Sequence, residues 1–145
     1  LGKVLIAPFE VRLSARSSRE PDILFVSREH QHRSDGKRLI GAPDLVVEVI
    51  SDDSVRRDRL VKRDEYAAAG VPEYWIIDCR PGQEREEFLV LDQTGRYKED
   101  ERAADGRFRS TVVPGFWLDP AWLRADPLPS VAACLRAVAP GYFAG

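Results

Sequence analysis

The sequence predicts an α/β fold in which a mixed β-sheet carries few flanking helices. Most apolar residues fall in short runs rich in β-branched and aromatic side chains, which are typical of strands. One longer segment, from about Val55 to Ala69, instead has apolar residues at helical spacing. Strand-like runs stand before and after it. This order favours a mixed sheet with a single main helix over a regular alternation of strands and helices.

The first half of the chain contains the strands expected before that helix. Phe9 to Leu13 alternates apolar and polar residues, which indicates a strand with one buried face. Pro21-Asp22 opens another strand, because a proline at the first residue costs no ladder hydrogen bond. We expect strands at 3–7, 9–13, 23–26 and 44–50 (the central strand), a polar loop at 14–20, and a surface loop or short helix at 27–39.

The second half begins with the main helix. Residues 51–54 offer several N-cap acceptors, Gly70 stands where a C-cap glycine belongs, and Pro72 blocks continuation. Asp58, Lys62 and Tyr66 follow one another at intervals of four and so share a helix face. Beyond the helix we expect strands at 74–78, 88–91, 96–98 and 108–113, the last closing a meander, and a short amphipathic helix at 130–138.

Composition places the chain among soluble globular proteins. It has 145 residues, 43% of them hydrophobic and 32% charged, which predicts one domain over 1–145. No apolar run approaches the roughly 20 residues that cross a bilayer, and no signal peptide is visible. Cys79 and Cys134 lack metal-ligand spacing. We expect both to be buried and reduced in a cytoplasmic protein, with a disulfide as the alternative.

The charge balance excludes a purely electrostatic nucleic-acid binder. The net charge is −2, but residues 1–63 hold 13 Lys/Arg and 10 Asp/Glu, whereas residues 64–145 hold 9 and 14. The basic first half either faces an anion or reflects a random split of a near-neutral surface. His30 and His32 lie in a polar loop and are expected to be solvated. We expect the aromatic residues to be core rather than a base-stacking platform: Tyr74, Trp75, Phe116, Trp117 and Trp122.

Glu48 is the most unusual residue of the sequence. It lies within the apolar run from Leu45 to Ile50, where a carboxylate is costly unless it is paired or binds a cation. A second acid, Asp22, enters a nearby strand, and Lys62 follows on the helix. Carboxylate-bound Mg²⁺ can activate water and neutralise a phosphate, and a lysine can orient the attacking water. These three residue types therefore suit phosphodiester hydrolysis.

Each of these residues also has a structural alternative. Asp22 could simply shape the strand entry, and Glu48 could face water on an edge strand. Lys62 could be a surface residue that pairs with Asp58, and Asp44 is expected to cap or turn into its strand.

Several motifs of the chain resemble one known family. The motifs are Pro21-Asp22, Gly41-Ala42-Pro43-Asp44-Leu45-Val46-Val47-Glu48-Val49-Ile50-Ser51, Asp58 with Lys62 and Tyr66, and Gly70-Val71-Pro72-Glu73-Tyr74-Trp75-Ile76-Ile77-Asp78. Together they are similar to the Uma-type putative restriction endonucleases of the PD-(D/E)XK nuclease superfamily, from about Gly2 to Leu123. The resemblance implies a restriction endonuclease-like core with the metal acids on adjacent strands.

The resemblance also assigns roles to individual residues. It implies that Asp22 and Glu48 hold Mg²⁺ or Mn²⁺, with the Val49 carbonyl as a further ligand. The superfamily lysine would fall at Ile50, so Lys62 on the following helix would take its place and position the nucleophilic water. Relatives carry an N-terminal helical segment before the first strand, which we expect this chain to lack. Arg56, Arg57 and Arg63 flank Lys62 and are candidates for phosphate contacts.

These expectations add up to a cytoplasmic, magnesium-dependent endonuclease that hydrolyses DNA. We expect a DNA substrate, no membrane partner and a possible homodimer. The alternative is a catalytically inactive nucleic-acid- or protein-binding module on the same fold, because a fold does not guarantee chemistry. A structural or toxin–antitoxin-type partner is a third interpretation.

Overall fold

The computed structural model describes residues 1–54, 57–100 and 103–143. The chain divides into two compact units, Leu1–Asp100 and Glu101–Gly145, which are described separately. The first unit holds the main helix and most of the strands. The prediction of one domain over 1–145 stays a prediction.

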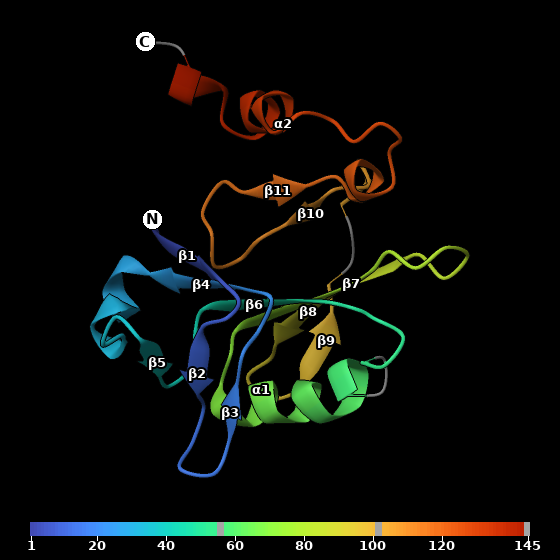
Figure 1. Ribbon diagram of the computed structural model, residues 1–145. Coiled ribbons are helices and arrows are strands. Elements are labelled where there is room, and N and C mark those ends of the chain that lie inside the picture. Colours follow the sequence, from blue (N-terminus) through green and yellow to red (C-terminus); the bar gives the residue numbers. More distant parts are fainter. Residues whose placement is uncertain (55–56, 101–102, 144–145) are drawn as a thin grey trace. The chain divides into compact units, whose positions relative to one another are not determined.

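A six-stranded mixed sheet forms the centre of the first unit (Figure 1). Its spatial order is β1-β4-β6-β7-β8-β9, with β6 and β7 parallel and the other neighbouring pairs antiparallel. The strands are β1 (Gly2–Ile6), β4 (Ile23–Ser27), β6 (Leu45–Val49), β7 (Glu73–Asp78), β8 (Arg85–Leu91) and β9 (Tyr97–Glu99). This confirms the predicted mixed sheet with few helices, including an internal position for the strand that carries Glu48.

The parallel pair β6–β7 dictates where the main helix lies. Parallel strands cannot be joined by a tight hairpin, so the chain crosses back over the sheet between them. A π-helical segment, η2 (Arg57–Lys62), and the α-helix α1 (Arg63–Ala69) make this crossover. Tyr66 of α1 packs with Val46, Tyr74 and Ile76 of the sheet, so the helix covers one sheet face.

The predicted helix is confirmed in place but differs in form. Its first part is π-helical, and residues 55–56 of the prediction lie outside the described residues. Ser54 does not cap α1; its hydroxyl accepts the Ser51 N–H at 3.0 Å. Gly70 ends the helix with φ +79°, in the left-handed region that favours glycine.

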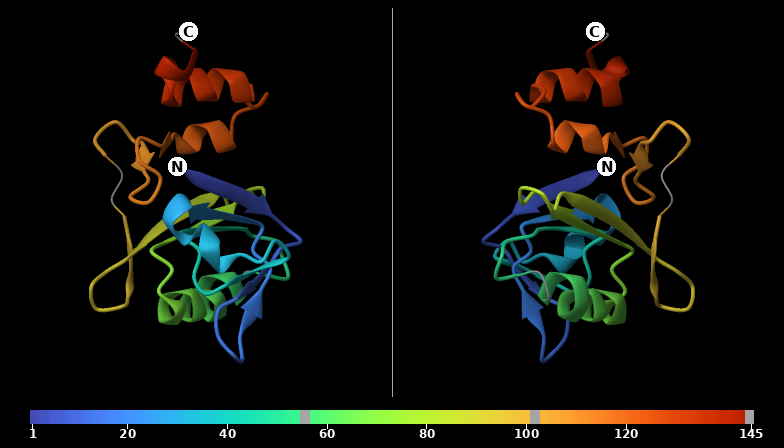
Figure 2. Two further views of the ribbon diagram at one scale, coloured as in Figure 1. Left: turned by 90° about the vertical axis from the view of Figure 1, so that its left-hand side faces the viewer. Right: turned by 90° about the vertical axis from the view of Figure 1, so that its right-hand side faces the viewer.

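A second, three-stranded sheet covers the other part of the same face. It has the order β3-β2-β5, with β2 (Glu10–Arg12), β3 (Ser18–Arg19) and β5 (Arg38–Ile40). Val11 and Leu39 pack with Leu24 and Val26 of β4. Figures 1 and 2 show this small sheet beside α1, below the main sheet. The expected loop at 14–20 therefore contains a short strand, and residues 27–39 contain a 3₁₀ helix, η1 (Arg28–Arg33), before β5.

The second unit corrects one prediction. Residues 108–113 do not close the meander, because β10 (Phe108–Arg109) pairs with β11 (Trp117–Leu118) in a separate two-stranded sheet. The 3₁₀ helix η3 (Pro120–Leu123), the helix α2 (Val131–Val138) and the 3₁₀ helix η4 (Pro140–Phe143) follow. α2 matches the predicted amphipathic helix, and its N-cap Ser130 accepts the Ala133 N–H at 3.2 Å.

Two further expectations need correction. Cys79 is exposed and Cys134 half-buried, so neither is fully buried, and neither forms a disulfide. The aromatic residues are core only in part: Tyr74 and Trp75 are buried in the first unit, whereas Phe116, Trp117 and Trp122 of the second unit are half-buried. Among the described residues, no helix is long and apolar enough to cross a membrane.

Candidate active site

Glu48 faces the helix-covered side of the main sheet. Val46 and Ile50, two residues before and after it, belong to the core cluster that contains Tyr66. Glu48 is only 2% exposed, and a buried carboxylate is costly unless it is compensated. Lys62 supplies a cation, with its Nζ 2.9 Å from Glu48 Oε2. The Tyr66 hydroxyl donates to the other oxygen, Oε1, at 2.8 Å. The predicted edge-strand alternative for Glu48 is therefore wrong.

The helix places both partners of Glu48 by its geometry. Lys62 ends the π-helical segment, and Tyr66 lies one α-helical turn later, so the two side chains project from the same face. The Tyr66 ring meets the Tyr74 ring edge-on, with centroids 5.0 Å apart. Burial, followed by the negative charge of Glu48, raises the pKa of the Tyr66 hydroxyl far above its usual value. Tyr66 is therefore a fixed hydrogen-bond donor.

Asp22 lies beside Glu48 across the β4–β6 pair. Ile23 is paired with Val47, so Asp22 and Glu48 occupy the next antiparallel positions on adjacent chain segments. The Asp22 carboxylate accepts the Val49 N–H at 2.7 Å. Asp22 is half-buried, whereas Glu48 is buried. The two acids are therefore neighbours, one fixed by the main chain and one by the helix.

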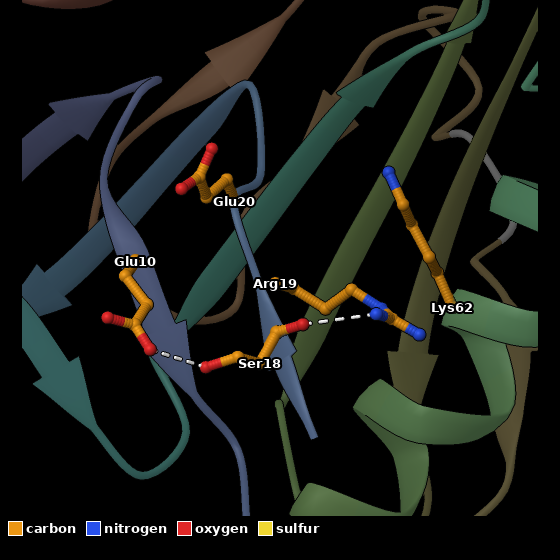
Figure 3. Close-up of a pocket in the computed structure, with 5 residues that line it drawn as sticks. All are labelled: Glu10, Ser18, Arg19, Glu20 and Lys62. Atoms are coloured by element: carbon orange, nitrogen blue, oxygen red, sulfur yellow. Dashed lines mark hydrogen bonds between the residues drawn. The ribbon is translucent and has the colours of Figure 1, made fainter. Parts of the chain in front are cut away.

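An open pocket of about 430 Å³ is lined by Lys62, whereas Asp22 and Glu48 are not among the described residues that line it. Its other lining residues are Glu10, Ser18, Arg19 and Glu20. Figure 3 shows Lys62 extending from the helix on one side, with Glu10 and Glu20 on the other. Arg19 joins the two sides, because its Nη2 lies 2.6 Å from Glu65 Oε1 of α1. The pocket thus contains acidic, basic and hydroxyl groups.

The family of the chain follows from comparison with known proteins. Residues 1–121 match the family model Uma2, described as putative restriction endonuclease. The chain belongs to this family. The predicted membership is therefore confirmed over most of the sequence.

A comparison with solved structures found a further similar protein. The solved structure is a crystal structure of a putative nuclease of the DUF820 family from Anabaena variabilis ATCC 29413. It is 18% identical, has a TM-score of 0.44, and the match covers 68% of the present chain and 65% of that chain. At that overlap the likeness carries no information about the site. No curated protein matches the chain.

The two neighbouring acids are of the residue type that suits a small divalent cation. Asp22 and Glu48 supply carboxylate oxygens, which hard cations such as Mg²⁺ prefer. Within 1–54, 57–100 and 103–143 no group of three or more His, Cys, Asp or Glu side chains is arranged to hold a metal ion. The two-carboxylate set fits Mg²⁺, which keeps several water ligands, better than Zn²⁺, which takes nitrogen and sulfur ligands.

The other sequence candidates lie away from the pocket. His30 is not simply solvated: its Nδ1 lies 2.8 Å from Asp44 Oδ1. The second oxygen of Asp44 accepts the Ser27 N–H at 2.7 Å, so Asp44 joins η1 to β4. His32 Nδ1 contacts the Glu29 carbonyl. These contacts are structural, and they account for Asp44 more fully than a role at the start of its strand.

The arginines near Lys62 have different environments. Arg63 donates to the Tyr97 carbonyl at 3.2 Å and lines a different pocket, of about 300 Å³, with Asp64 and Arg96. Arg56 and the side chains of Arg57 and Asp58 lie outside the described residues. The proposed phosphate contacts of these arginines stay a prediction.

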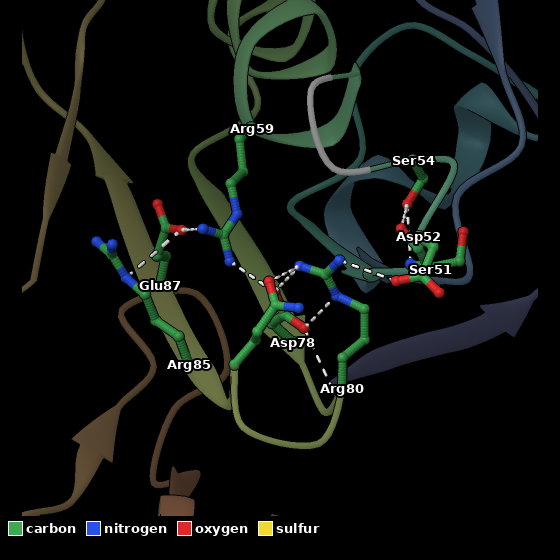
Figure 4. Close-up of polar contacts among 9 residues, drawn as sticks. Ser51, Asp52, Ser54, Arg59, Asp78, Arg80, Arg85 and Glu87 are labelled. Atoms are coloured by element: carbon green, nitrogen blue, oxygen red, sulfur yellow. Dashed lines mark hydrogen bonds and ion pairs between the residues drawn. The ribbon is translucent and has the colours of Figure 1, made fainter.

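A buried ion network anchors the start of the helix (Figure 4). Asp78, at the end of β7, is 2% exposed and accepts from Arg59 Nη2 at 3.0 Å and from Arg80 Nε at 2.9 Å. Arg59 Nη1 also lies 3.3 Å from Glu87 of β8. The hydrogen bonds of Arg80 hold the pKa of Asp78 below its usual value. Because Arg59 precedes Lys62 by three residues, this network holds the helix that carries Lys62.

Four residues near Lys62 were not predicted from the sequence: Glu10 and Glu20, which line the pocket, and Arg59 and Asp78, which form the ion network. Asp78 had a usable signal, since it ends the apolar run Tyr74–Ile77 much as Glu48 interrupts its own run. Glu20 stands two residues before Asp22, so its place in the sequence could have indicated that it lies near the site. Glu10 had no such signal, because the β2–β3 hairpin brings it to the pocket only in three dimensions.

Proposed function

We propose that this protein is a metal-dependent endonuclease that hydrolyses phosphodiester bonds of DNA. The observation that carries the proposal is the buried Glu48 carboxylate paired with Lys62 at an open pocket, with Asp22 at the neighbouring strand position. Membership of the Uma2 family supports a nuclease in general. Cys79 and Cys134 form no disulfide, which fits a cytoplasmic location.

The metal would be Mg²⁺ or Mn²⁺, held by Asp22 and Glu48 with the Val49 carbonyl as a further ligand. Such an ion supplies positive charge at the phosphate and lowers the pKa of water. Lys62 would donate a hydrogen bond that orients the attacking water and would offset negative charge developing on the phosphate. The Val49 N–H fixes Asp22, and Lys62 and Tyr66 fix Glu48, so the site is held before substrate arrives.

A cleavage assay on supercoiled plasmid tests this proposal. The full 145-residue chain is expected to nick or cut DNA with Mg²⁺ or Mn²⁺ and to stop with EDTA. Ca²⁺ should support binding better than cleavage, because its looser coordination organises the attacking water poorly. An RNA substrate run in parallel decides between the two nucleic acids, and gel filtration tests the proposed homodimer.

Variants identify the residues responsible. Asp22→Ala, Glu48→Ala and Lys62→Ala should each lose most of the activity, and their effects should not add, because the groups act as a unit. Lys98→Ala is the matched control: Lys98 is also paired with a carboxylate, Asp92 at 3.0 Å, but is 75% exposed and does not line the pocket. A folded, metal-binding chain that cuts no nucleic acid would favour the binding-module alternative.

A further inference from the structure

The two oxygens of the Glu48 carboxylate have different surroundings. Oε1 accepts the hydrogen bond from the Tyr66 hydroxyl at 2.8 Å. Oε2 lies 2.9 Å from the Lys62 ammonium, and Lys62 lines the pocket. One oxygen is therefore held by the buried core, and the other faces the ammonium of Lys62, a residue that lines the pocket.

The Tyr66 hydroxyl is held firmly at this position. Tyr66 is 0% exposed, and its ring is fixed by edge-on contact with Tyr74. Tyr66 also belongs to a core cluster with Val46, Ile50 and Ile76, so the ring has no space to turn away. The buried ring therefore keeps the hydroxyl within hydrogen-bond distance of Oε1.

We propose that Tyr66 is a positioning residue that makes Glu48 a one-oxygen metal ligand and thereby favours Mg²⁺ over Ca²⁺. The inference rests on the proposed metal-dependent function. Mg²⁺ requires near-octahedral geometry with one-oxygen carboxylate ligands, whereas Ca²⁺ takes six to eight oxygens and readily accepts both oxygens of one carboxylate. A donor that occupies Oε1 disfavours the two-oxygen mode and so acts against Ca²⁺.

Tyr97 provides a matched control for Tyr66. Tyr97 is a second buried tyrosine of the same core cluster, 7% exposed. Its hydroxyl also makes a buried hydrogen bond, at 2.7 Å, but to the Val71 carbonyl rather than to Glu48. Tyr66→Phe and Tyr97→Phe each remove one buried hydroxyl. Only the first releases a carboxylate oxygen of the site.

Calorimetric titration of Mg²⁺ and of Ca²⁺ into the full chain tests the proposal. Tyr66→Phe is expected to lose about 10–100-fold in Mg²⁺ affinity, the usual cost of removing a group that orients a metal ligand. Its Ca²⁺ affinity should fall less, so the ratio of the two Kd values moves toward Ca²⁺. Tyr97→Phe should leave that ratio unchanged. Equal ratios in both variants would overturn the proposal for Tyr66 while leaving the metal site intact.

An infrared measurement covers the case in which Tyr66→Phe does not fold. The Mg²⁺-minus-metal-free difference spectrum of the wild type, compared with that of Glu48→Ala, isolates the Glu48 carboxylate stretches. The wide splitting of one-oxygen coordination is expected, and a narrow, two-oxygen splitting would overturn the proposal. A wild type that binds neither Mg²⁺ nor Ca²⁺, or a Glu48→Ala variant that binds both as tightly, would overturn the proposed function as well.

Discussion

Removal of the Lys62 ammonium should destabilise the protein far more than removal of a surface lysine. Lys62→Met keeps most of the side-chain volume but leaves the buried Glu48 carboxylate without the cation that lies 2.9 Å from it. At an effective dielectric constant of about 20, the attraction between the two charges is about 6 kcal/mol, most of which offsets their desolvation. The variant loses this attraction but still buries the carboxylate.

The net cost follows from the burial of both partners. Breaking a buried pair by removing one partner costs about 3–5 kcal/mol. Lys62 is 14% exposed, and the Tyr66 hydrogen bond to Glu48 remains, so the lower end of this range is expected. A loss of about 3 kcal/mol lowers the ratio of folded to unfolded protein by roughly a hundredfold.

Urea unfolding in EDTA measures this loss. Lys98→Met is the control, and because its pair with Asp92 is exposed it should cost no more than about 1 kcal/mol. The double variant Lys62→Met/Glu48→Gln removes the buried charge, while the amide oxygen can still accept from Tyr66, so it should regain much of the stability. Equal losses for the two single lysine variants, or no recovery in the double variant, would refute the assignment of Lys62 as the buried partner of Glu48.

Two further predictions concern the rest of the first unit. The pKa of Asp78 is lowered in the folded state, chiefly by its hydrogen bonds from Arg80. The ionised Asp78 side chain therefore contributes its full stabilisation above the ordinary pKa of 3.8. This stabilisation is lost as the pH falls through the lower pKa of the folded state. Asp78→Asn should flatten the acid limb of stability measured by urea unfolding between about pH 5 and 2, and an unchanged limb would contradict the network. Gly70→Ala should cost about 1 kcal/mol in the same assay, because φ is +79° there while no atom lies within 4 Å of an added Cβ. A neutral result at Gly70 would mean that the left-handed helix end relaxes.

The strands and the main helix could be predicted from residue periodicity. The apolar runs Leu45–Val47 and Tyr74–Ile77 are buried and rich in β-branched or aromatic residues, and both lie in internal strands. Gly70 and Pro72 marked the end of the helix correctly. Periodicity does not determine pairing, however. Phe108 begins a strand-like run, but the turn at Pro114-Gly115 returns the chain locally to Trp117, and this hairpin replaced the expected meander.

The candidate site was only partly readable from the sequence. Glu48 was identifiable because a carboxylate in an apolar run requires a partner. Helical spacing put Lys62 and Tyr66 on one helix face, and the role of Lys62 came from the resemblance to the family. The sequence did not indicate that both would contact one carboxylate, because this depends on how the helix packs over β6. Glu10 reaches the pocket through pairing of β2 with β3 and β5, a long-range contact that local pattern does not encode.

Manganese binding between the two acids tests the central claim most directly. Crystals of the full chain soaked in Mn²⁺ and measured at the manganese absorption edge should show one anomalous peak within ligand distance of the carboxylates of Asp22 and Glu48. The peak should vanish in Glu48→Ala and persist in Lys98→Ala. Strong manganese density elsewhere, with none between Asp22 and Glu48, would contradict the assignment of these two acids as the metal ligands of the active site.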